Sequence, residues 1–233
     1  MKRLFDIALG TALAILVLPL VVILAVGVAI SLRAWPYFTQ TRIGRDGKPF
    51  TFIKLRTLPV HAPKYADKYE IAAFHRKGLA GFLRKSHLDE LPQLFLVPLG
   101  RLSLVGPRPE MPHLHENLGS FGVARTAVRP GCVGLWQVST GTQRLIGESP
   151  EYDLFYLQRW SVRFDVWILF RYLTLLAGLQ SQVALEDVPS WATGRGLVAP
   201  SAIDAAAPSS AERAAVAAPI PEPALPALRP AGG

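Results

Sequence analysis

The feature that most limits the fold of this chain is an uncharged apolar run near its N-terminus. Residues 7–32 contain no Asp, Glu, Lys or Arg and consist mainly of Leu, Val, Ile and Ala. A helix of about 20 apolar residues crosses the hydrocarbon core of a bilayer, so this run is long enough to do so. A cleaved signal peptide is not indicated, because the apolar part is too long and no Ala-x-Ala site stands out. The sequence therefore predicts a membrane-associated protein whose residues 1–34 form a membrane domain.

Two features leave the path of this segment open. Pro19 lies near its middle, where a proline removes a helical hydrogen bond and kinks the helix. Basic residues flank both ends, which gives no orientation under the positive-inside rule. These flanking residues are Lys2, Arg3, Arg33, Arg42, Arg45 and Lys48. A kinked single span and a bent hairpin with both ends in the cytoplasm satisfy the pattern, and the physical argument alone favours the single span.

The overall charge points to anionic partners. The chain carries 25 Lys and Arg against 17 Asp and Glu, a formal net charge of +8. Such a surplus suits lipid headgroups, phosphates or nucleic acid. The single cysteine, Cys132, excludes an intrachain disulfide, and no Cys/His spacing typical of a zinc site is present.

Two adjacent carboxylates, Asp89 and Glu90, lie in an otherwise basic neighbourhood. Pro92 follows closely, and proline is tolerated in a first helical turn, so Asp89 is expected at the N-cap or in the first turn of a short helix. A helix N-terminus favours anions, and two acids there can divide the work between nucleophilic attack and metal binding. For the dipeptide alone, ordinary helix capping is the commoner explanation.

Arg108 stands between Pro107 and Pro109. Pro109 biases Arg108 towards an extended backbone, and Pro107 fixes its own φ. This stiff setting suits a guanidinium that binds phosphate through two hydrogen bonds. A structural turn with a surface arginine is the alternative.

A β-hairpin is expected between residues 40 and 56, with a turn at residues 45–48. Lys54 and Arg56 then share one face of the second strand, because strand side chains repeat every two residues. Two cations on one face can meet a diphosphate, although a solvated basic face is the alternative.

Several short runs carry a combined signal that each of them lacks alone. They are, in chain order, residues 2–6 (KRLFD), 40–44 (QTRIG), 52–57 (FIKLRT), 88–93 (LDELPQ), 103–109 (SLVGPRP) and 129–131 (RPG), with Gly134 and Gln137. In this order they resemble the bacterial sugar transferases, which are monotopic polyprenyl-phosphate glycosyl-1-phosphate transferases, also called undecaprenyl-phosphate sugar phosphotransferases. The resemblance covers roughly residues 1–178.

The resemblance implies a fold and a location. Residues 1–34 would form a re-entrant helix-break-helix instead of a single span, and residues 35–187 a catalytic domain on the cytoplasmic face of the bacterial inner membrane. The fold class is then α/β but mostly helical, with a short β-hairpin and amphipathic interface helices. Residues 151–178 show helical spacing of apolar residues interrupted by charges, which fits an amphipathic helix at the interface as well as a core helix. Residues 188–233 are rich in Ala, Pro and Ser and are expected to be disordered.

The resemblance also implies a Mg²⁺-dependent enzyme. It would transfer a sugar 1-phosphate from a nucleoside diphosphate sugar, with UDP-sugars as the family expectation, to polyprenyl (undecaprenyl) phosphate, initiating polysaccharide or glycoconjugate assembly. On the matching positions Asp89 would be the nucleophile of a covalent phospho-sugar intermediate, Glu90 a Mg²⁺ ligand and Arg108 a phosphate ligand. An acid close to Mg²⁺ and cations is expected to stay ionised at neutral pH. The further candidates are Lys54, Arg56 and Arg129 for phosphate and Gln137 for sugar or nucleotide.

The expected partners are thus the nucleotide sugar, polyprenyl phosphate and membrane lipid, without nucleic acid, and a homodimer is left open. A different class of function also fits the charge, the interface helix and the Pro-rich tail. It is a basic, membrane-anchored scaffold that binds anionic lipid or a partner protein. That alternative does not explain why Asp89 and Glu90 lie among cations near a rigid arginine, and activity without Asp89 would separate the two.

Overall fold

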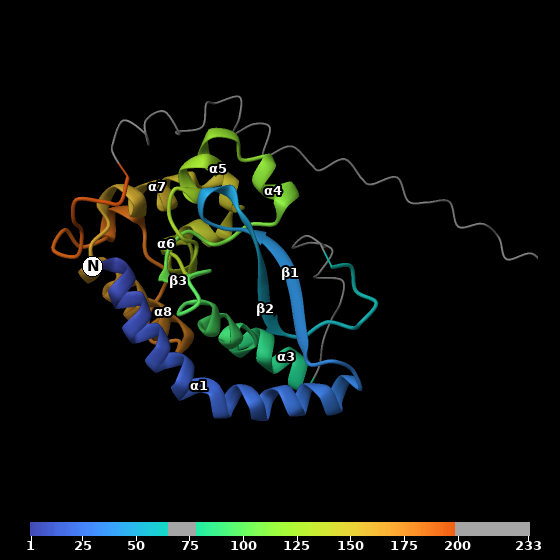
Figure 1. The fold of residues 1–233 in the computed structure, drawn as a ribbon. Coiled ribbons are helices and arrows are strands. Elements are labelled where there is room, and N and C mark those ends of the chain that lie inside the picture. The colour runs from blue at the N-terminus through green and yellow to red at the C-terminus, as the bar shows by residue number, and fades with distance from the viewer. Residues whose placement is uncertain (65–77, 199–233) are drawn as a thin grey trace, which may run out of the picture.

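The computed structural model describes residues 1–64 and 78–198. The strands are β1 (Tyr37–Ile43), β2 (Pro49–Leu55), β3 (Ser103–Val105) and β4 (Gly131–Val133). The α-helices are α1 (Lys2–Leu32), α3 (Gly78–Lys85), α4 (Pro112–Glu116), α5 (Gly119–Thr126), α6 (Leu135–Val138), α7 (Pro150–Arg159) and α8 (Val162–Leu176). The 3₁₀ helices are η1 (Arg45–Gly47), η2 (Leu88–Leu96), η3 (Thr140–Gln143), η4 (Ile146–Glu148) and η5 (Leu185–Asp187). The expected mostly helical architecture with a small hairpin is confirmed, and α1 lies along one side of the other elements (Figure 1).

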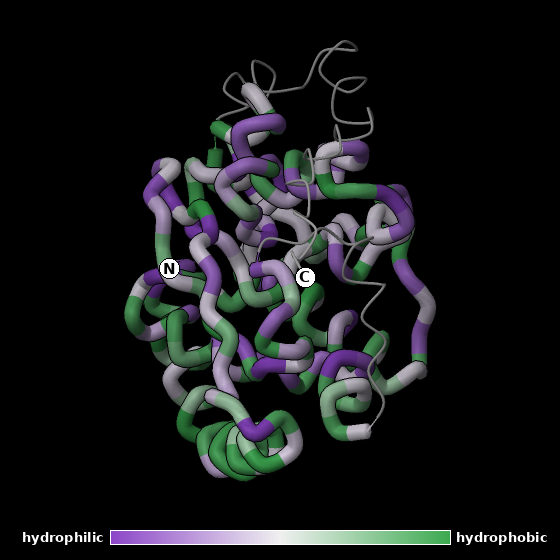
Figure 2. The backbone as a smooth tube through the Cα atoms, turned by 90° about the vertical axis from the view of Figure 1, so that its right-hand side faces the viewer, coloured by the Kyte–Doolittle hydropathy of each residue, from purple (hydrophilic) through white to green (hydrophobic). Residues whose placement is uncertain are grey.

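Helix α1 is the one helix in the described chain that is long and apolar enough to cross a membrane. It contains Pro19, yet its helical residues continue from Lys2 to Leu32. Figure 1 shows that α1 changes direction near its middle, as a proline inside a helix predicts. Its residues are mainly hydrophobic (Figure 2). Large side chains on its outer side, such as Leu16 and Ile23, are exposed. The expected bend is therefore present, as a kink in one continuous helix.

The first turns of α1 are bonded to the rest of the protein through their charged side chains. Lys2 Nζ donates to the carbonyl of Val105 at 2.9 Å and pairs with Asp165 Oδ2 at 2.7 Å. Arg3 donates to the carbonyls of Val97 and Pro98 at 2.8 and 3.0 Å. Lys2 and Arg3 thus attach the N-terminus of α1 to β3, to α8 and to the residues just after η2.

Asp6 also has a structural role, because its buried carboxylate contacts a backbone N–H and a hydroxyl. Its carboxylate is buried, accepts a bond from the Leu104 N–H at 3.0 Å, and lies 2.8 and 2.9 Å from the Ser103 hydroxyl. Gly10, one turn further, allows close approach, because a Cβ there would lie 2.6 Å from the Val97 side chain. The start of α1 is thus fixed against η2 and β3.

The strands form two small sheets. Strands β1 and β2 pair antiparallel, with Tyr37 opposite Leu55 and Ile43 opposite Pro49, so the expected hairpin is confirmed. Strands β3 and β4 pair in parallel, and Gly106 and Gly131 lie against each other just beyond β3. A Cβ on Gly131 would be only 2.1 Å from the Gly106 nitrogen, so a side chain at this position would break the junction.

The main hydrophobic core gathers side chains from β2, β3, α6, α7 and α8, including the fully buried Tyr156, Phe164 and Ile168. A second cluster joins the C-terminal half of α1 to α3 and β2 through Ala25, Val28, Leu55 and Leu83. The globular part therefore packs against both halves of α1.

Residues 151–178 form two helices where a single amphipathic helix was expected. Helices α7 and α8 meet at Trp160 and Ser161, and the Ser161 hydroxyl caps α8 by accepting a bond from the Phe164 N–H at 3.0 Å. Helix α7 is a core helix, whereas α8 leaves Phe170 and Leu173 exposed opposite its buried face. A serine N-cap favours a new helix start over continuation.

The prediction that residues 188–233 are disordered is wrong for residues 188–198. Ala192 is fully buried, and the Leu197 N–H donates to the Leu157 carbonyl at 2.7 Å, so this stretch packs on α7. Compositional bias did not predict these backbone hydrogen bonds. The remainder of the expected tail, residues 199–233, lies outside the described residues.

Candidate active site

The paired carboxylates lie in the first turn of η2, where the sequence placed Asp89. His87 precedes them in the left-handed region, with φ of 57°, and so turns the chain sharply out of α3. The Glu90 N–H donates to the His87 carbonyl at 3.1 Å, and Pro92 is buried within the helix. The local sequence thus orients Asp89 and Glu90 on a short, well-packed helix.

Glu90 and Arg108 form a two-point ion pair. Arg108 Nη2 lies 2.9 Å from Glu90 Oε1, and Nη1 lies 3.4 Å from Oε2. The exposed fractions of the two side chains are 17% and 27%, so the pair remains open to solvent on one side. An open arginine of this kind can bind phosphate with its remaining N–H groups.

The two neighbouring carboxyl groups have opposite electrostatic settings. Burial raises the pKa of Asp89 to about 6, with a further increase from the negative charge of Glu90, while Lys54 opposes the shift. Burial also acts to raise the pKa of Glu90, but the charge and hydrogen bonds of Arg108 outweigh it and lower that pKa to about 2. Cations therefore hold Glu90 ionised, whereas at Asp89 burial and the charge of Glu90 outweigh the opposing effect of the cations, so its pKa rises. At pH 7 Asp89 is still mainly a carboxylate.

Lys54 is the hairpin cation that faces this site. Burial lowers its pKa, and the charges of Asp89 and Glu90 act in the opposite direction, which places the three groups in one electrostatic cluster. Its ammonium lies 5.4 Å from the centre of the Phe38 ring. Arg56 follows β2 and donates to the carbonyls of Trp35 and Tyr37 at 3.1 and 3.3 Å. The two cations expected to act together thus contact different groups.

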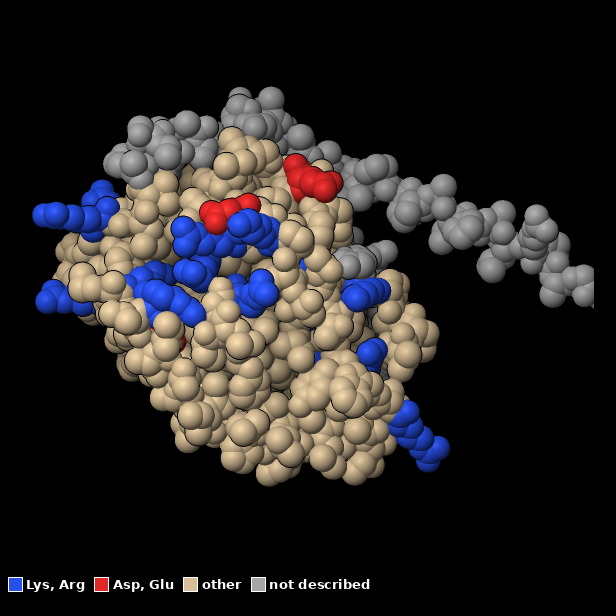
Figure 3. Space-filling model, in the orientation of Figure 1, with Lys and Arg blue, Asp and Glu red and all other residues tan. Residues whose placement is uncertain are grey.

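Arg129 and Gln137 also have structural partners. Arg129 Nε donates to the Gly100 carbonyl at 3.0 Å, and its charged neighbours include Arg3 and Arg45. Burial together with these positive charges lowers the Arg129 pKa. Figure 3 shows Lys and Arg side chains gathered on one face of the molecule.

Gln137 Oε1 accepts a bond from the Gly134 N–H at 2.8 Å and caps α6. The structure brings Asp89, Glu90, Arg108 and Lys54 together, and it gives Arg129 and Gln137 contacts elsewhere.

Sequence reasoning missed Tyr172 of α8 as a neighbour of this site. Its ring lies 6.3 Å, edge to face, from that of His87. Burial and the negative charge of Glu90 raise its pKa above the ordinary value. In the sequence Tyr172 fits the apolar repeat of α8, so only its phenol hydroxyl hinted at a polar setting.

The carboxylates of Asp89 and Glu90 are suited to weak binding of a hard cation such as Mg²⁺. Among residues 1–64 and 78–198, no group of three or more His, Cys, Asp or Glu side chains is arranged to hold a metal. Mg²⁺ commonly binds through one or two carboxylates together with substrate phosphates and water. Glu90 with Asp89 beside it provides such carboxylates, so the residues present fit Mg²⁺ that arrives with a phosphorylated substrate.

An apolar helix of membrane length beside a carboxylate–guanidinium site defines a membrane-associated protein with a centre suited to phosphate chemistry. The sequence pattern of the family described as bacterial sugar transferase matches residues 1–178. The chain belongs to this family.

Named relatives agree with this assignment. The chain is 34% identical over 195 residues to a UDP-glucose:undecaprenyl-phosphate glucose-1-phosphate transferase of Klebsiella pneumoniae, covering 78% of this chain and 41% of the relative. It is 34% identical over 196 residues to the protein of the same name from Escherichia coli, covering 79% of this chain and 41% of that relative. It is 31% identical over 186 residues to the exopolysaccharide production protein ExoY of Rhizobium meliloti, covering 73% of this chain and 82% of the relative. The chain thus spans about two fifths of the length of the first two relatives and most of the third.

Proposed function

We propose that this protein transfers a sugar 1-phosphate from a UDP-sugar to undecaprenyl phosphate. The observation that carries the proposal is the buried Asp89 beside the Glu90–Arg108 ion pair, within the region that matches the family. Relatives named for UDP-glucose and for UDP-galactose support a nucleotide sugar as donor. Such a product would start the assembly of a polysaccharide or glycoconjugate.

In the proposed reaction Asp89 is the nucleophile. Its carboxylate oxygen forms a bond to the phosphorus that carries the sugar, and the bond from that phosphorus to the leaving UMP breaks. An oxygen of the acceptor phosphate then forms a bond to the same phosphorus, and the bond to Asp89 breaks, which regenerates the carboxylate. Splitting the transfer into two steps avoids direct contact between two anionic substrates.

The neighbouring charged groups bind and orient the phosphates. Arg108 offers N–H groups that its bonds to Glu90 leave available, and Lys54 adds a partly desolvated ammonium. Glu90, ionised at all neutral pH values, is the proposed Mg²⁺ ligand. When bound, Mg²⁺ would neutralise charge on the phosphoryl oxygens. Glu90 and Arg108 fix each other, so both stay in place before substrate arrives.

The proposal places α1 in the cytoplasmic leaflet of the inner membrane as a re-entrant helix. Three observations support this geometry: the change of direction of α1, its exposed apolar surface, and the contacts of its two halves with the same globular body. The exposed Phe170 and Leu173 of α8 would lie in the interface. The acceptor phosphate would then meet the site at the level of the lipid headgroups.

The test is release of UMP from a panel of UDP-sugars by the purified full chain in nanodiscs containing undecaprenyl phosphate. We expect release that requires both the acceptor and Mg²⁺ and that is lost in Asp89→Asn. A variant of the exposed Asp187, Asp187→Asn, is the matched control and should keep wild-type activity. Undiminished release by Asp89→Asn would contradict the nucleophile assignment. Absence of release from every donor, together with binding of anionic lipid, would favour a scaffold.

A further inference from the structure

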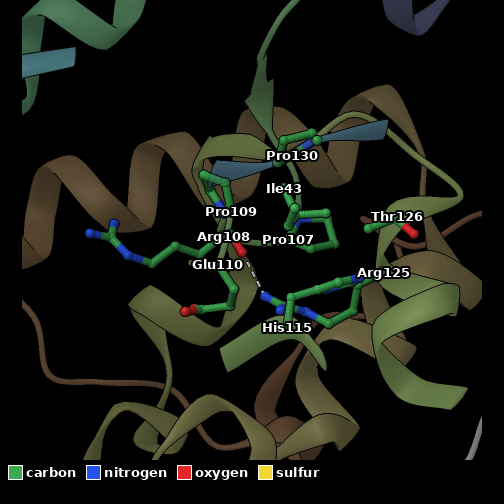
Figure 4. Close-up of a pocket in the computed structure, with 10 residues that line it drawn as sticks. Ile43, Pro107, Arg108, Pro109, Glu110, His115, Arg125, Thr126 and Pro130 are labelled. Carbon is green, nitrogen blue, oxygen red and sulfur yellow. Dashed lines mark hydrogen bonds between the residues drawn. The ribbon is translucent and has the colours of Figure 1, made fainter. Parts of the chain in front are cut away.

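The turn that carries Arg108 is held from three directions through its backbone carbonyls. The Gly131 N–H donates to the Pro107 carbonyl at 2.9 Å, and Arg42 Nη1 donates to the Pro109 carbonyl at 3.1 Å. Between them, Arg125 Nη2 donates to the carbonyl of Arg108 itself at 2.6 Å (Figure 4). Since Pro107 and Pro109 have no N–H, these carbonyls are the main polar groups by which the turn can be fixed.

Arg125 is itself fixed by a second buried charge. Its Nε lies 2.8 Å from Oδ2 of Asp153, and the exposed fractions of the two side chains are 4% and 2%. Arg125 comes from α5 and Asp153 from α7, so the pair ties two helices to the Arg108 turn. The planar guanidinium is suited to this task, because one edge binds the carboxylate while another nitrogen reaches the carbonyl.

Stability alone is a poor reason for this pair. Removing two charges from water is costly, and buried ion pairs can often be replaced by apolar residues without loss of stability. The cost is increased here because Asp153 Oδ1 is buried without a hydrogen-bond partner in the described structure. A small pocket lined by Arg108, Arg125 and His115, among others, lies on the Arg125 side of the pair.

We propose that Arg125, held by Asp153, is a positioning residue that sets the backbone of Arg108 and thereby the two-point contact of Arg108 with Glu90. The inference rests on the proposed function for its catalytic consequence, but not for its geometry. Arginine uses two separate nitrogens, Nε for Asp153 and Nη2 for the Arg108 carbonyl, whereas lysine at position 125 has only one, so the planar link between these two acceptors is lost. Arg125→Lys therefore keeps the charge and removes the positioning.

The first test reads the geometry of Arg108 without using activity. In full-length protein labelled with ¹⁵N-arginine, a guanidinium held at two points rotates slowly and gives separate Nη resonances, which Arg108→Lys identifies by their loss. We expect Arg125→Lys to shift or merge these resonances. Arg144→Lys is the matched control, because Arg144 pairs with Glu151 at the surface, with exposed fractions of 52% and 40%. Arg108 resonances that stay unchanged in Arg125→Lys would overturn the proposal.

The second test asks whether Arg125 acts through Arg108. Misplacement of a binding group by about 1 Å can cost on the order of 100-fold in rate, so Arg125→Lys should lower kcat by about 10- to 100-fold. In an Arg108→Lys background the same change should cost nothing further. An equal loss in both backgrounds would show a merely structural role and overturn the proposal.

The proposal can still be tested if a variant does not fold or if the wild type is inactive. If Arg125→Lys does not fold, Asp153→Asn, which removes the charge that holds Arg125, is read in the same two experiments. If the wild type releases no UMP, the proposed function fails, while the resonances of Arg108 still decide the positioning role.

Discussion

Two regions of this protein place carboxylates in apolar surroundings, and they treat them differently. At the start of α1, Asp6 is buried and its carboxylate oxygens accept hydrogen bonds from the Leu104 N–H and the Ser103 hydroxyl. At the start of η2, Asp89 is equally buried, and burial together with the charge of Glu90 disfavours its ionised form. A buried carboxylate whose oxygens are taken up by hydrogen bonds within the fold serves structure, whereas one whose ionised form the fold disfavours is available for chemistry.

The largest expected effect concerns activity and separates the two regions. Asp89→Asn should lower UMP release by about 1,000-fold or more, because an amide is not a nucleophile of comparable strength. Asp6→Asn should leave the rate per folded molecule within about threefold, because Asp6 contacts structure only. Initial rates normalised to folded protein measure both. Loss of the same size in Asp6→Asn would remove the distinction.

The next effect concerns stability at the start of α1. Asp6→Asn should lower the free energy of unfolding by about 2 to 4 kcal/mol, because a neutral amide replaces the carboxylate that accepts from both the Leu104 N–H and the Ser103 hydroxyl. Thermal unfolding in detergent measures the change. Asp187→Asn, at an exposed position, should stay within about 0.5 kcal/mol. An Asp6 variant as stable as the wild type would show that these hydrogen bonds are dispensable.

A change of opposite sign is expected for Asp89. Its folded pKa of about 6 lies above the ordinary value of 3.8, so the folded state binds the proton more tightly than the unfolded state. Stability therefore falls as the pH rises from about 4 to about 6. In the presence of EDTA, Asp89→Asn should raise the free energy of unfolding at pH 7.5 by roughly 1 to 3 kcal/mol.

That gain should disappear below pH 4, where the wild-type carboxyl is protonated in both states. Melting curves across this range provide the measurement, with Asp187→Asn as the reference. Destabilisation of Asp89→Asn at pH 7.5 would mean that the ionised carboxylate is favoured by the fold after all.

The smallest expected effect is on the KM for the UDP-sugar and concerns Arg129, which lies between the two regions. Arg129 contacts the Gly100 carbonyl and has Arg3 of α1 as a charged neighbour. Arg129→Gln should therefore change the KM for the UDP-sugar by less than about threefold, as expected for a charge away from the site. Steady-state kinetics at constant ionic strength would show it. A KM increase of tenfold or more would place Arg129 among the phosphate ligands, as first expected.

The sequence predicted those parts of the site that depend on local rules. The Pro-Arg-Pro turn, the first-turn position of Asp89 and the hairpin that carries Lys54 follow from residue types and spacing, and all three appear in the structure. The sequence did not predict the contacts that close over long separations. Arg125 has no motif of its own, and its role depends on Arg108 and Asp153, which are 17 and 28 residues away.

Strand periodicity was also insufficient for Lys54 and Arg56. Alternation of side chains along a strand puts Lys54 and Arg56 on one face, but β2 ends at Leu55. Arg56 lies beyond the strand and donates to the carbonyls of Trp35, just before β1, and of Tyr37, the first residue of β1. The break between α7 and α8 was missed for a similar reason, because the apolar repeat continues across it while the Ser161 cap does not depend on periodicity.

The bond between Lys2 and Asp165 has a consequence for biosynthesis, since it joins residues 163 positions apart. On the ribosome α1 is translated, and can associate with a membrane, long before α8 has been translated. During that interval Lys2 and Asp6 lack the partners described above, and contacts of such long sequence separation form late. Membrane association would therefore precede completion of the fold. A chain arrested before residue 165 would carry α1 but lack the partner of Lys2.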